Sequence, residues 1–293
     1  LGAENPDLVV MDADLSKSTM TAEFGKKYPE RFFNMGIAEQ NLYGAAAGLA
    51  LSGKVVCAST FAMFAAGRAF EIIRNSIGYT RANVKICATH SGITVGEDGA
   101  SHQTFEDIAL MRTIPGMTVI NPSDGVSAGK LIRQAVAFNG PCYVRLGRAA
   151  VPVFYGEDSE ITLGKGNLIR EGRDVTVIAT GIMVSEAAAA AEKLAEDGID
   201  VRVIDMHTIK PLDEEIIIKA AEETGAIVTA EEHSVIGGLG SAVAEVVVRN
   251  HPVKMSMVGQ KDTYGESGKP DELKKKYGMT SDDIIKAVKE LIS

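Results

Sequence analysis

Short apolar runs rich in β-branched residues alternate with longer helical patterns along the whole of this 293-residue chain. The runs with the composition of strands are 8–11, 55–58, 84–89, 117–120, 142–146, 174–179, 201–204 and 226–230. The predicted helices are 38–51, 68–78, 123–138, 185–195, 213–224, 241–250 and 281–291, with Ser123, Ser185 and Ser281 as expected N-caps. Strands that alternate with helices form parallel sheets covered on both faces. We therefore expect an α/β fold with mostly parallel sheets sandwiched by helices.

A segment rich in turn-forming and acidic residues divides this alternation into two parts. Residues 149–173 contain Pro152, several glycines and an acidic cluster at 157–160. Segments of this composition connect folded units. We therefore expect two domains, at 1–155 and 165–293.

Charge and composition limit the classes of function and partner. The chain has 30 basic and 39 acidic residues, whereas neutralising nucleic-acid phosphates requires clustered Lys and Arg. No apolar run approaches the ~20 residues of a membrane-spanning helix. Cys57, Cys87 and Cys142 are scattered, as in reduced cytoplasmic proteins. We expect a cytoplasmic protein that binds neither nucleic acid nor membranes. Because Leu1-Gly2 has the pattern of a helix end, we also expect a helical segment before it.

Glu39 lies in the first turn of the predicted helix that follows Gly36, and its neighbours in the sequence are mostly apolar or small. A carboxylate at this position can simply complement the helix dipole. Among apolar neighbours it also tends to stay protonated or to find a specific partner. The residues alone leave both interpretations open, a structural one and one in which Glu39 holds a proton for a ligand.

Aromatic and titratable residues follow two of the predicted strands. Phe61 and Phe64 come after strand 55–58 and either pack in the core or line a ligand pocket, since ligands bind at strand ends in open α/β sheets. Strand 84–89 is followed at once by a glycine-rich loop that contains His90, Asp98 and His102. Paired imidazoles suit proton transfer. These three residues could also hold a metal ion, but a flexible loop without a fourth ligand is a poor scaffold, so we expect no metal there.

Two further patterns point to anions. Arg145 and Arg148 follow one another at the end of strand 142–146, where they could clamp a phosphate or form ion pairs. Gly237–Gly240 opens a helix like part of a dinucleotide fingerprint, although Val243 stands where a third glycine belongs. We interpret this run as helix-start packing or an anion-binding turn.

Together these segments resemble the C-terminal half of transketolase, and the resemblance covers essentially the whole chain. In chain order the matching segments are 13–15 with Ser18, 36–40, 60–64, His90 with 96–99 and 101–103, Arg148, and 208–213. The resemblance implies the pyrimidine-binding and C-terminal domains of a thiamine diphosphate enzyme that transfers a two-carbon ketol unit between sugar phosphates.

The resemblance also assigns roles to individual residues. It implies that Glu39 hydrogen-bonds N1′ of the cofactor's aminopyrimidine and so activates the thiazolium carbon. The other implied cofactor contacts are Asp14, Ile37, Phe61 and Phe64. The implied substrate contacts are Ser18, His90, Asp98, His102 and Arg148, with His90 and His102 in proton transfer and with Ser18 and Arg148 on the phosphate.

One part of the family pattern is missing from the sequence. The Gly-Asp-Gly motif of the diphosphate and metal site does not occur, and Gly96–Gly99 has a different pattern. The resemblance therefore implies a partner, the N-terminal transketolase subunit, which supplies the diphosphate site and Mg²⁺ or Ca²⁺ in a dimer of pairs. A fragment of a longer polypeptide is the other interpretation.

Rival functions share parts of this pattern. The C-terminal half of deoxyxylulose-phosphate synthase and the β subunit of 2-oxoacid dehydrogenase share the fold and the glutamate, but the two histidines with Ser18 and Arg148 favour ketol transfer. A non-catalytic assembly subunit has no reason to keep Glu39, His90 and His102 together. A His/Asp hydrolase is disfavoured because no Gly-x-Ser-x-Gly motif occurs.

Overall fold

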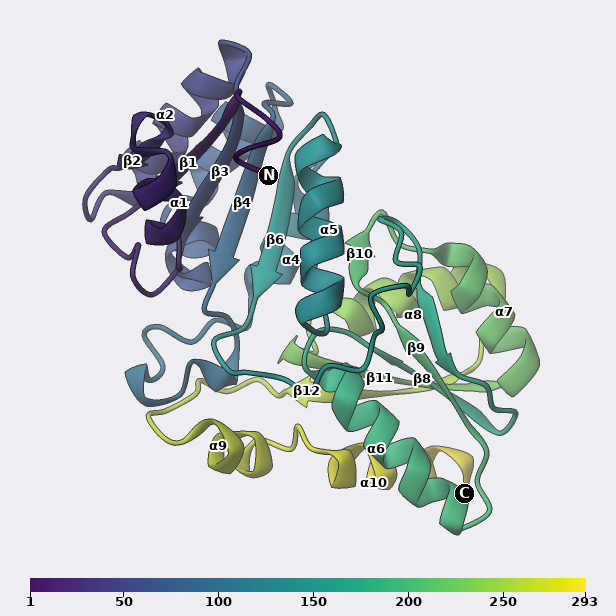
Figure 1. Cartoon of the computed structure of the whole chain (residues 1–293). Helices are drawn as coiled ribbons and strands as arrows, with labels where there is room; N and C mark the ends of the chain where they lie inside the picture. Colours follow the sequence, from purple (N-terminus) through teal and green to yellow (C-terminus); the bar gives the residue numbers. More distant parts are fainter.

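Two mostly parallel sheets, each with helices packed on it, organise the computed structural model, which describes residues 1–293 (Figure 1). The first has the strand order β10-β5-β6-β4-β3-β1-β2, and the second β12-β11-β8-β9-β7. The first sheet contains β1 (Leu8–Asp12), β2 (Phe32–Asn34), β3 (Val55–Thr60), β4 (Val84–Thr89), β5 (Thr118–Ile120), β6 (Cys142–Leu146) and β10 (Thr208–Lys210). The second contains β7 (Asn167–Arg170), β8 (Val175–Ala179), β9 (Val201–Asp205), β11 (Ala226–Ser234) and β12 (Lys254–Gln260). Only β10 and β7 run antiparallel to their neighbours, so the expected α/β fold is confirmed.

Helices fill the intervals between strands. In the first half they are α1 (Ala22–Lys27), η1 (Pro29–Arg31), α2 (Glu39–Leu51), η2 (Phe64–Arg68), α3 (Phe70–Ile72), η3 (Ile73–Gly78), η4 (Ile93–Asp98), α4 (Asp107–Thr113) and α5 (Gly125–Ala137). In the second half they are α6 (Met183–Glu196), α7 (Glu214–Thr224), α8 (Leu239–Asn250), α9 (Pro270–Lys276) and α10 (Ser281–Ile292). The helix predicted at 68–78 begins earlier, at Phe64, and contains wide π-type turns. No helix is both long and apolar enough to span a membrane.

The three expected serine caps are wrong, each by one to three residues. Asp124 caps α5, because its carboxylate accepts a hydrogen bond from the Ser127 backbone N–H at 2.8 Å. Thr280 is the N-cap of α10, and its backbone N–H and hydroxyl donate to the Asp283 carboxylate at 3.0 and 2.6 Å. Helix α6 begins at Met183, so Ser185 lies inside its first turn. At α5 and α10 neighbouring polar residues compete for the cap position, and the geometry of the entering chain decides between them, whereas α6 begins after Ile182 without a side-chain cap.

Burial explains why the central strands have no polar face. All five residues of β1 and all five of β8 are buried, as parallel strands are when helices cover both faces. On one side of the first sheet, α2 buries Leu42, Tyr43 and Ala46 completely. The small residues of α2 let it lie close to the sheet, so Glu39 at its first turn is held at the sheet's edge.

The second half of the chain contributes one strand to the first sheet. Thr208–Lys210 forms β10, which pairs with β5. The Lys210 ammonium donates hydrogen bonds to the carbonyl oxygens of Arg112 and Ile114, both at 2.7 Å. This strand was not predicted, because three residues are too few to show a period. It joins the two halves.

Candidate active site

The carboxyl ends of four parallel strands meet at one edge of the first sheet. Asp14 and Ser18 follow β1, Phe61 follows β3, His90 follows β4 and Arg148 follows β6. Adjacent parallel strands end on the same side, so residues far apart in the sequence converge here. This edge therefore collects most of the residues that the sequence singled out.

Four rings form a cluster at this edge. The Phe61 and His90 rings stack with centroids 4.5 Å apart, and the Phe61 and Phe64 rings lie 6.2 Å apart. His102 approaches Phe64 edge-on at 5.2 Å. Phe61 and Phe64 lie nearly one helical turn apart, and the loop after β4 returns His102 to their side. The cluster forms an aromatic wall beside two imidazoles.

Glu39 is buried at the start of α2 without a hydrogen bond from its own chain. It is 3% exposed, and its nearest charged group is the Arg68 guanidinium, 3.5 Å away. Burying a carboxylate without donors is costly. Glu39 therefore has carboxylate oxygens that remain free to bind a donor of an incoming group.

Asn34, which the sequence analysis did not identify, orders the turns around Glu39. Its side-chain oxygen accepts hydrogen bonds from the backbone N–H groups of Asp14 and Gly36, both at 3.0 Å. Its amide donates to the Asp14 carboxylate at 3.2 Å. Both Asp14 and Gly36 have positive φ, of 64° and 71°. Ile37 follows directly and is 79% exposed, so it faces outward from this edge.

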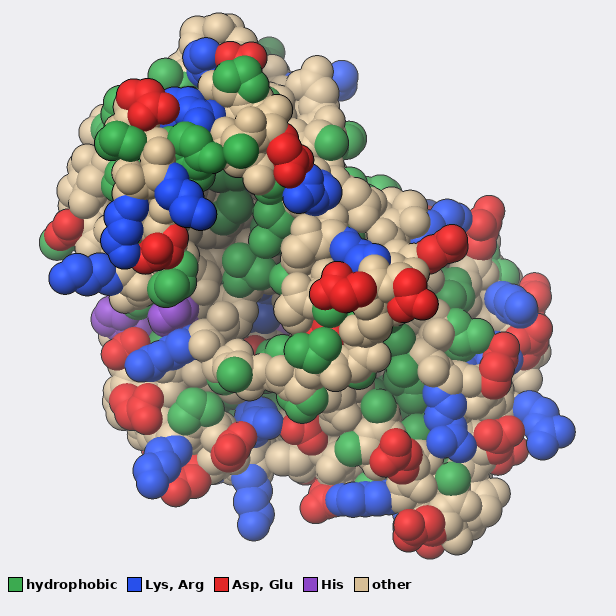
Figure 2. Space-filling model, in the orientation of Figure 1, with side chains coloured by type: hydrophobic (Ala, Val, Ile, Leu, Met, Phe, Trp, Pro, Cys, Tyr) green, Lys and Arg blue, Asp and Glu red, His purple; other side chains and the backbone are tan.

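A cavity of about 620 Å³ lies on the sheet beside the cluster. Ser18, His90 and Arg148 line it together, with Cys57, Ser59, Cys87 and Thr89 from the strands. In Figure 2 it is the hollow in the upper part of the molecule, with histidine side chains below it. Three of the predicted substrate contacts therefore share one cavity.

Arg148 and the loop after β4 set the electrostatics of the cavity. The Arg148 guanidinium donates to the Val95 carbonyl oxygen at 2.5 Å and lies 3.5 Å from the Asp98 carboxylate. Burial, reinforced by the positive charge of Arg148, lowers the pKa of His90 below its ordinary value. At neutral pH His90 is therefore an uncharged imidazole that can accept a proton.

The structure contains no group of three His, Cys, Asp or Glu side chains arranged to hold a metal ion. His90, Asp98 and His102 do not form such a group either.

Arg145 does not join Arg148 in the cavity, so the interpretation of the two as a phosphate clamp is wrong. Arg145 is 2% exposed, and its Nε donates to the Asp107 carboxylate at 2.8 Å. Its Nη2 donates to the Glu232 carbonyl oxygen at 2.9 Å. Arg145 and Asp107 form a buried structural ion pair where the two halves of the chain meet.

The glycine run at 237–240 packs a helix start, and a carboxylate of this chain fills its anion position. The N–H groups of Leu239 and Gly240 donate to the Glu231 carboxylate at 2.7 and 2.8 Å. A Cβ on Gly238 would lie 2.0 Å from a Glu231 oxygen. Glu231, Glu232 and His233 are buried on β11. The run Glu-Glu-His inside an otherwise apolar strand was the available signal that these groups are paired internally.

These features define a class: a two-domain α/β protein with a ligand site at the carboxyl edge of its first parallel sheet. The family model described as transketolase, pyrimidine binding domain matches residues 1–153, and that described as transketolase, C-terminal domain matches residues 164–284. The chain belongs to the transketolase family.

Individual relatives agree with this assignment. A putative transketolase C-terminal section from Methanocaldococcus jannaschii is 53% identical and is matched over 99% of this chain and 92% of its own length. Mouse transketolase is 38% identical over the whole chain, which spans 47% of the mouse protein. A solved split gene transketolase, described as an inactive β4 tetramer, superposes with a TM-score of 0.93 at 54% identity, covering 100% of this chain and 94% of that one.

Proposed function

We propose that this chain is the C-terminal subunit of a two-chain transketolase that transfers a two-carbon ketol unit between sugar phosphates. Its division into a pyrimidine-binding domain at 1–155 and a C-terminal domain at 165–293 belongs to the proposal. The observation that carries it is the buried Glu39 carboxylate, which has no hydrogen bond from its own chain and whose ion-pair partner Arg68 lies over the Phe64 ring, 5.4 Å from its centroid. That arrangement fits an aminopyrimidine, which offers a flat ring to stack and a ring nitrogen to protonate.

The residues present fit the pyrimidine half of thiamine diphosphate. Glu39 would hold the proton shared with the ring nitrogen, Phe61 and Phe64 would flank the ring, and Asp14 and Ile37 would complete the contacts. When bound, the cofactor supplies the carbon nucleophile that carries the ketol unit. The proposal assigns the diphosphate and Mg²⁺ or Ca²⁺ to the N-terminal subunit, since the Gly-Asp-Gly motif is absent from this sequence.

The remaining cavity residues have roles that follow from their chemistry. His90, as a neutral base, and His102 would move protons to and from substrate hydroxyls. The Asp98 carboxylate would accept a hydrogen bond from a hydroxyl. Ser18 would donate to the phosphate, and Arg148 would bind it through parallel N–H groups.

Exposed apolar side chains support a partner chain at this edge. Phe33 and Ile37 flank the segment that leads to Glu39 and are 42% and 79% exposed. Apolar groups around a ligand site favour coverage by another protein surface. We propose that the N-terminal subunit covers this edge and that the cofactor lies between the chains, in a dimer of such pairs.

The deciding experiment is an assay of ketol transfer from xylulose 5-phosphate to ribose 5-phosphate with thiamine diphosphate and Mg²⁺. We expect no turnover by this chain alone, and turnover on mixing it with an N-terminal transketolase subunit from the same source. Turnover without the partner would show that the diphosphate site has been assigned wrongly. A folded complex that transfers nothing from sugar phosphates would overturn the proposal, and 2-oxoacids would then test the synthase and dehydrogenase alternatives.

Arg148→Ala is expected to raise the KM for phosphorylated sugars in the mixed complex about 10-fold or more, because a charge-assisted hydrogen bond is worth ~1.5–3 kcal/mol. The KM for an unphosphorylated ketose should change little. Removing the positive charge should also raise the pKa of His90, so the acid limb of the kcat/KM profile moves to higher pH. Equal effects on phosphorylated and unphosphorylated sugars would exclude a role in binding the phosphate.

A further inference from the structure

The loop after β4 begins at His90, carries His102 near its end and is bonded to the second domain. The Gln103 side-chain amide donates to the Glu266 carbonyl oxygen of that domain at 2.9 Å, and also to two carbonyl oxygens inside the loop. Figure 1 shows α9 directly below the loop, and the Pro270 ring of α9 lies close to Gly96 of η4. The second domain therefore packs against the loop that carries the two histidines.

Glu232 of β11 makes the most buried of these contacts. It is 2% exposed, and its carboxylate accepts a hydrogen bond from the Thr94 backbone N–H at 2.7 Å. Gly92 has a φ of 75°, and a Cβ there would lie 2.3 Å from the Glu232 carboxyl carbon. The carboxylate is thus pressed against the loop backbone four residues after His90, and only glycine at 92 leaves room for it.

Glu232 is itself held in place from the first domain. Arg145 donates to its carbonyl oxygen at 2.9 Å and places a second nitrogen 4.0 Å from its carboxylate. Asp107 binds Arg145 at 2.8 Å and accepts a hydrogen bond from the Tyr143 hydroxyl at 2.7 Å. Because all of these groups are buried, the support under the loop has little freedom to shift.

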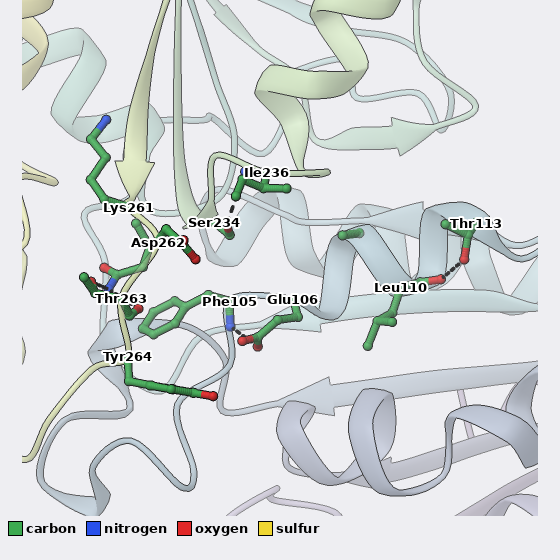
Figure 3. Close-up of a pocket in the computed structure, with 12 residues that line it drawn as sticks. Phe105, Glu106, Leu110, Thr113, Ser234, Ile236, Lys261, Asp262, Thr263 and Tyr264 are labelled. Carbon is green, nitrogen blue, oxygen red and sulfur yellow. Dashed lines mark hydrogen bonds between the residues drawn. The ribbon is translucent and has the colours of Figure 1, made fainter.

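A further hydrogen bond joins the domains just beyond the end of the loop. The Ser234 N–H donates to the Phe105 carbonyl oxygen at 2.9 Å. Figure 3 shows Phe105 and Glu106 facing Ser234, Asp262 and Tyr264 around a pocket of about 480 Å³ between the two domains. The loop is therefore tied to β11 both near its start and just after its end.

We propose that Glu232 is a positioning residue: from the second domain it fixes the loop that carries His90 and His102 relative to the substrate cavity. Glu232 is not among the residues that line the cavity, so it acts through the loop backbone and not on the substrate. The inference rests on the proposed function for its effect on turnover. Its effect on the loop itself depends only on the structure.

Two variants of Glu232 separate its hydrogen bond from its volume. Glu232→Ala removes the acceptor for the Thr94 N–H, whereas Glu232→Gln keeps a side-chain oxygen in the same place. Glu231→Ala is the matched control, because Glu231 is equally buried on the same strand but binds the start of α8. Gly92→Ala is an independent variant that forces the loop away from an intact Glu232.

Amide hydrogen exchange of the chain directly measures how readily the loop backbone opens. Glu232→Ala and Gly92→Ala should raise exchange across residues 92–104 about 10-fold or more, as expected from losing one hydrogen bond to a charged group. Glu232→Gln should stay near the parent chain. Glu231→Ala should raise exchange at the start of α8 and leave the loop unchanged.

Turnover in the mixed complex measures how the contact between Glu232 and the loop affects catalysis. Glu232→Ala should lower kcat for ketol transfer by about 10- to 100-fold, the cost of small misplacements of reacting groups, and Glu232→Gln should restore most of it. Unchanged loop exchange in both Glu232→Ala and Gly92→Ala, or an equal loss of kcat in Glu231→Ala, would overturn the inference. If the loop loosens as expected while the parent complex transfers no ketol unit, the proposed function fails and the loop support stands.

Discussion

In the mixed complex, Glu39→Ala is expected to lower kcat for ketol transfer by about 10²- to 10⁴-fold, the range that a positioned acid–base group contributes. The variant loses the only buried carboxylate at the carboxyl edge of the first sheet that has no hydrogen bond from its own chain. Glu39→Gln should lose nearly as much, because an amide oxygen accepts a hydrogen bond but does not hold the proton. Initial rates at saturating sugar phosphate and cofactor give the result.

Stability distinguishes this loss from unfolding. The buried Glu39 carboxylate has no hydrogen bond from its own chain, and its ion-pair partner Arg68 is largely exposed. Replacing Glu39 with alanine therefore removes a desolvation cost at the loss of a weak ion pair, and the thermal midpoint of the chain should change little. Glu30→Ala provides a control, because Glu30 is an exposed carboxylate of the same domain and its loss should leave kcat unchanged. Full activity of Glu39→Ala in the complex would refute the proposed role.

The sequence was sufficient where a local pattern determines the structure. Apolar runs located fully buried strands such as β1 and β8, since a parallel strand covered on both faces is apolar nearly throughout. The seven-residue β12 was not predicted, because its first half is exposed or half-buried and its sequence is mixed. The residues grouped by resemblance at 61, 64, 90 and 102 meet in one cluster, because they all follow parallel strands that end at the same edge. Helix starts were misplaced by one residue where adjacent polar side chains, such as Ser123 and Asp124, can each serve as a cap.

The sequence does not show which residues from distant segments contact one another in the fold. Arg145 and Arg148 stand three residues apart in one short motif, and nothing in that motif tells them apart. Arg145 lies inside β6, so its side chain turns toward α4, whereas Arg148 lies past the end of the strand and reaches the cavity. Asn34 and Glu232 were missed because their partners lie in other segments, the latter 138 residues from Thr94.

This difference between the two arginines predicts opposite costs in stability. Arg145→Ala should lower the free energy of unfolding by about 3–5 kcal/mol, because it leaves the carboxylate of Asp107 buried without its counter-ion. Arg148→Ala should cost about 1 kcal/mol or less, since its ion pairs are partly exposed to solvent. Denaturant unfolding of the two variants against the parent chain measures both. The double variant Arg145→Met with Asp107→Asn should recover part of the loss, because it removes both buried charges and not just one. If Arg145→Ala and Arg148→Ala unfold at the same denaturant concentration, the buried pair does not hold the domains together as its geometry indicates.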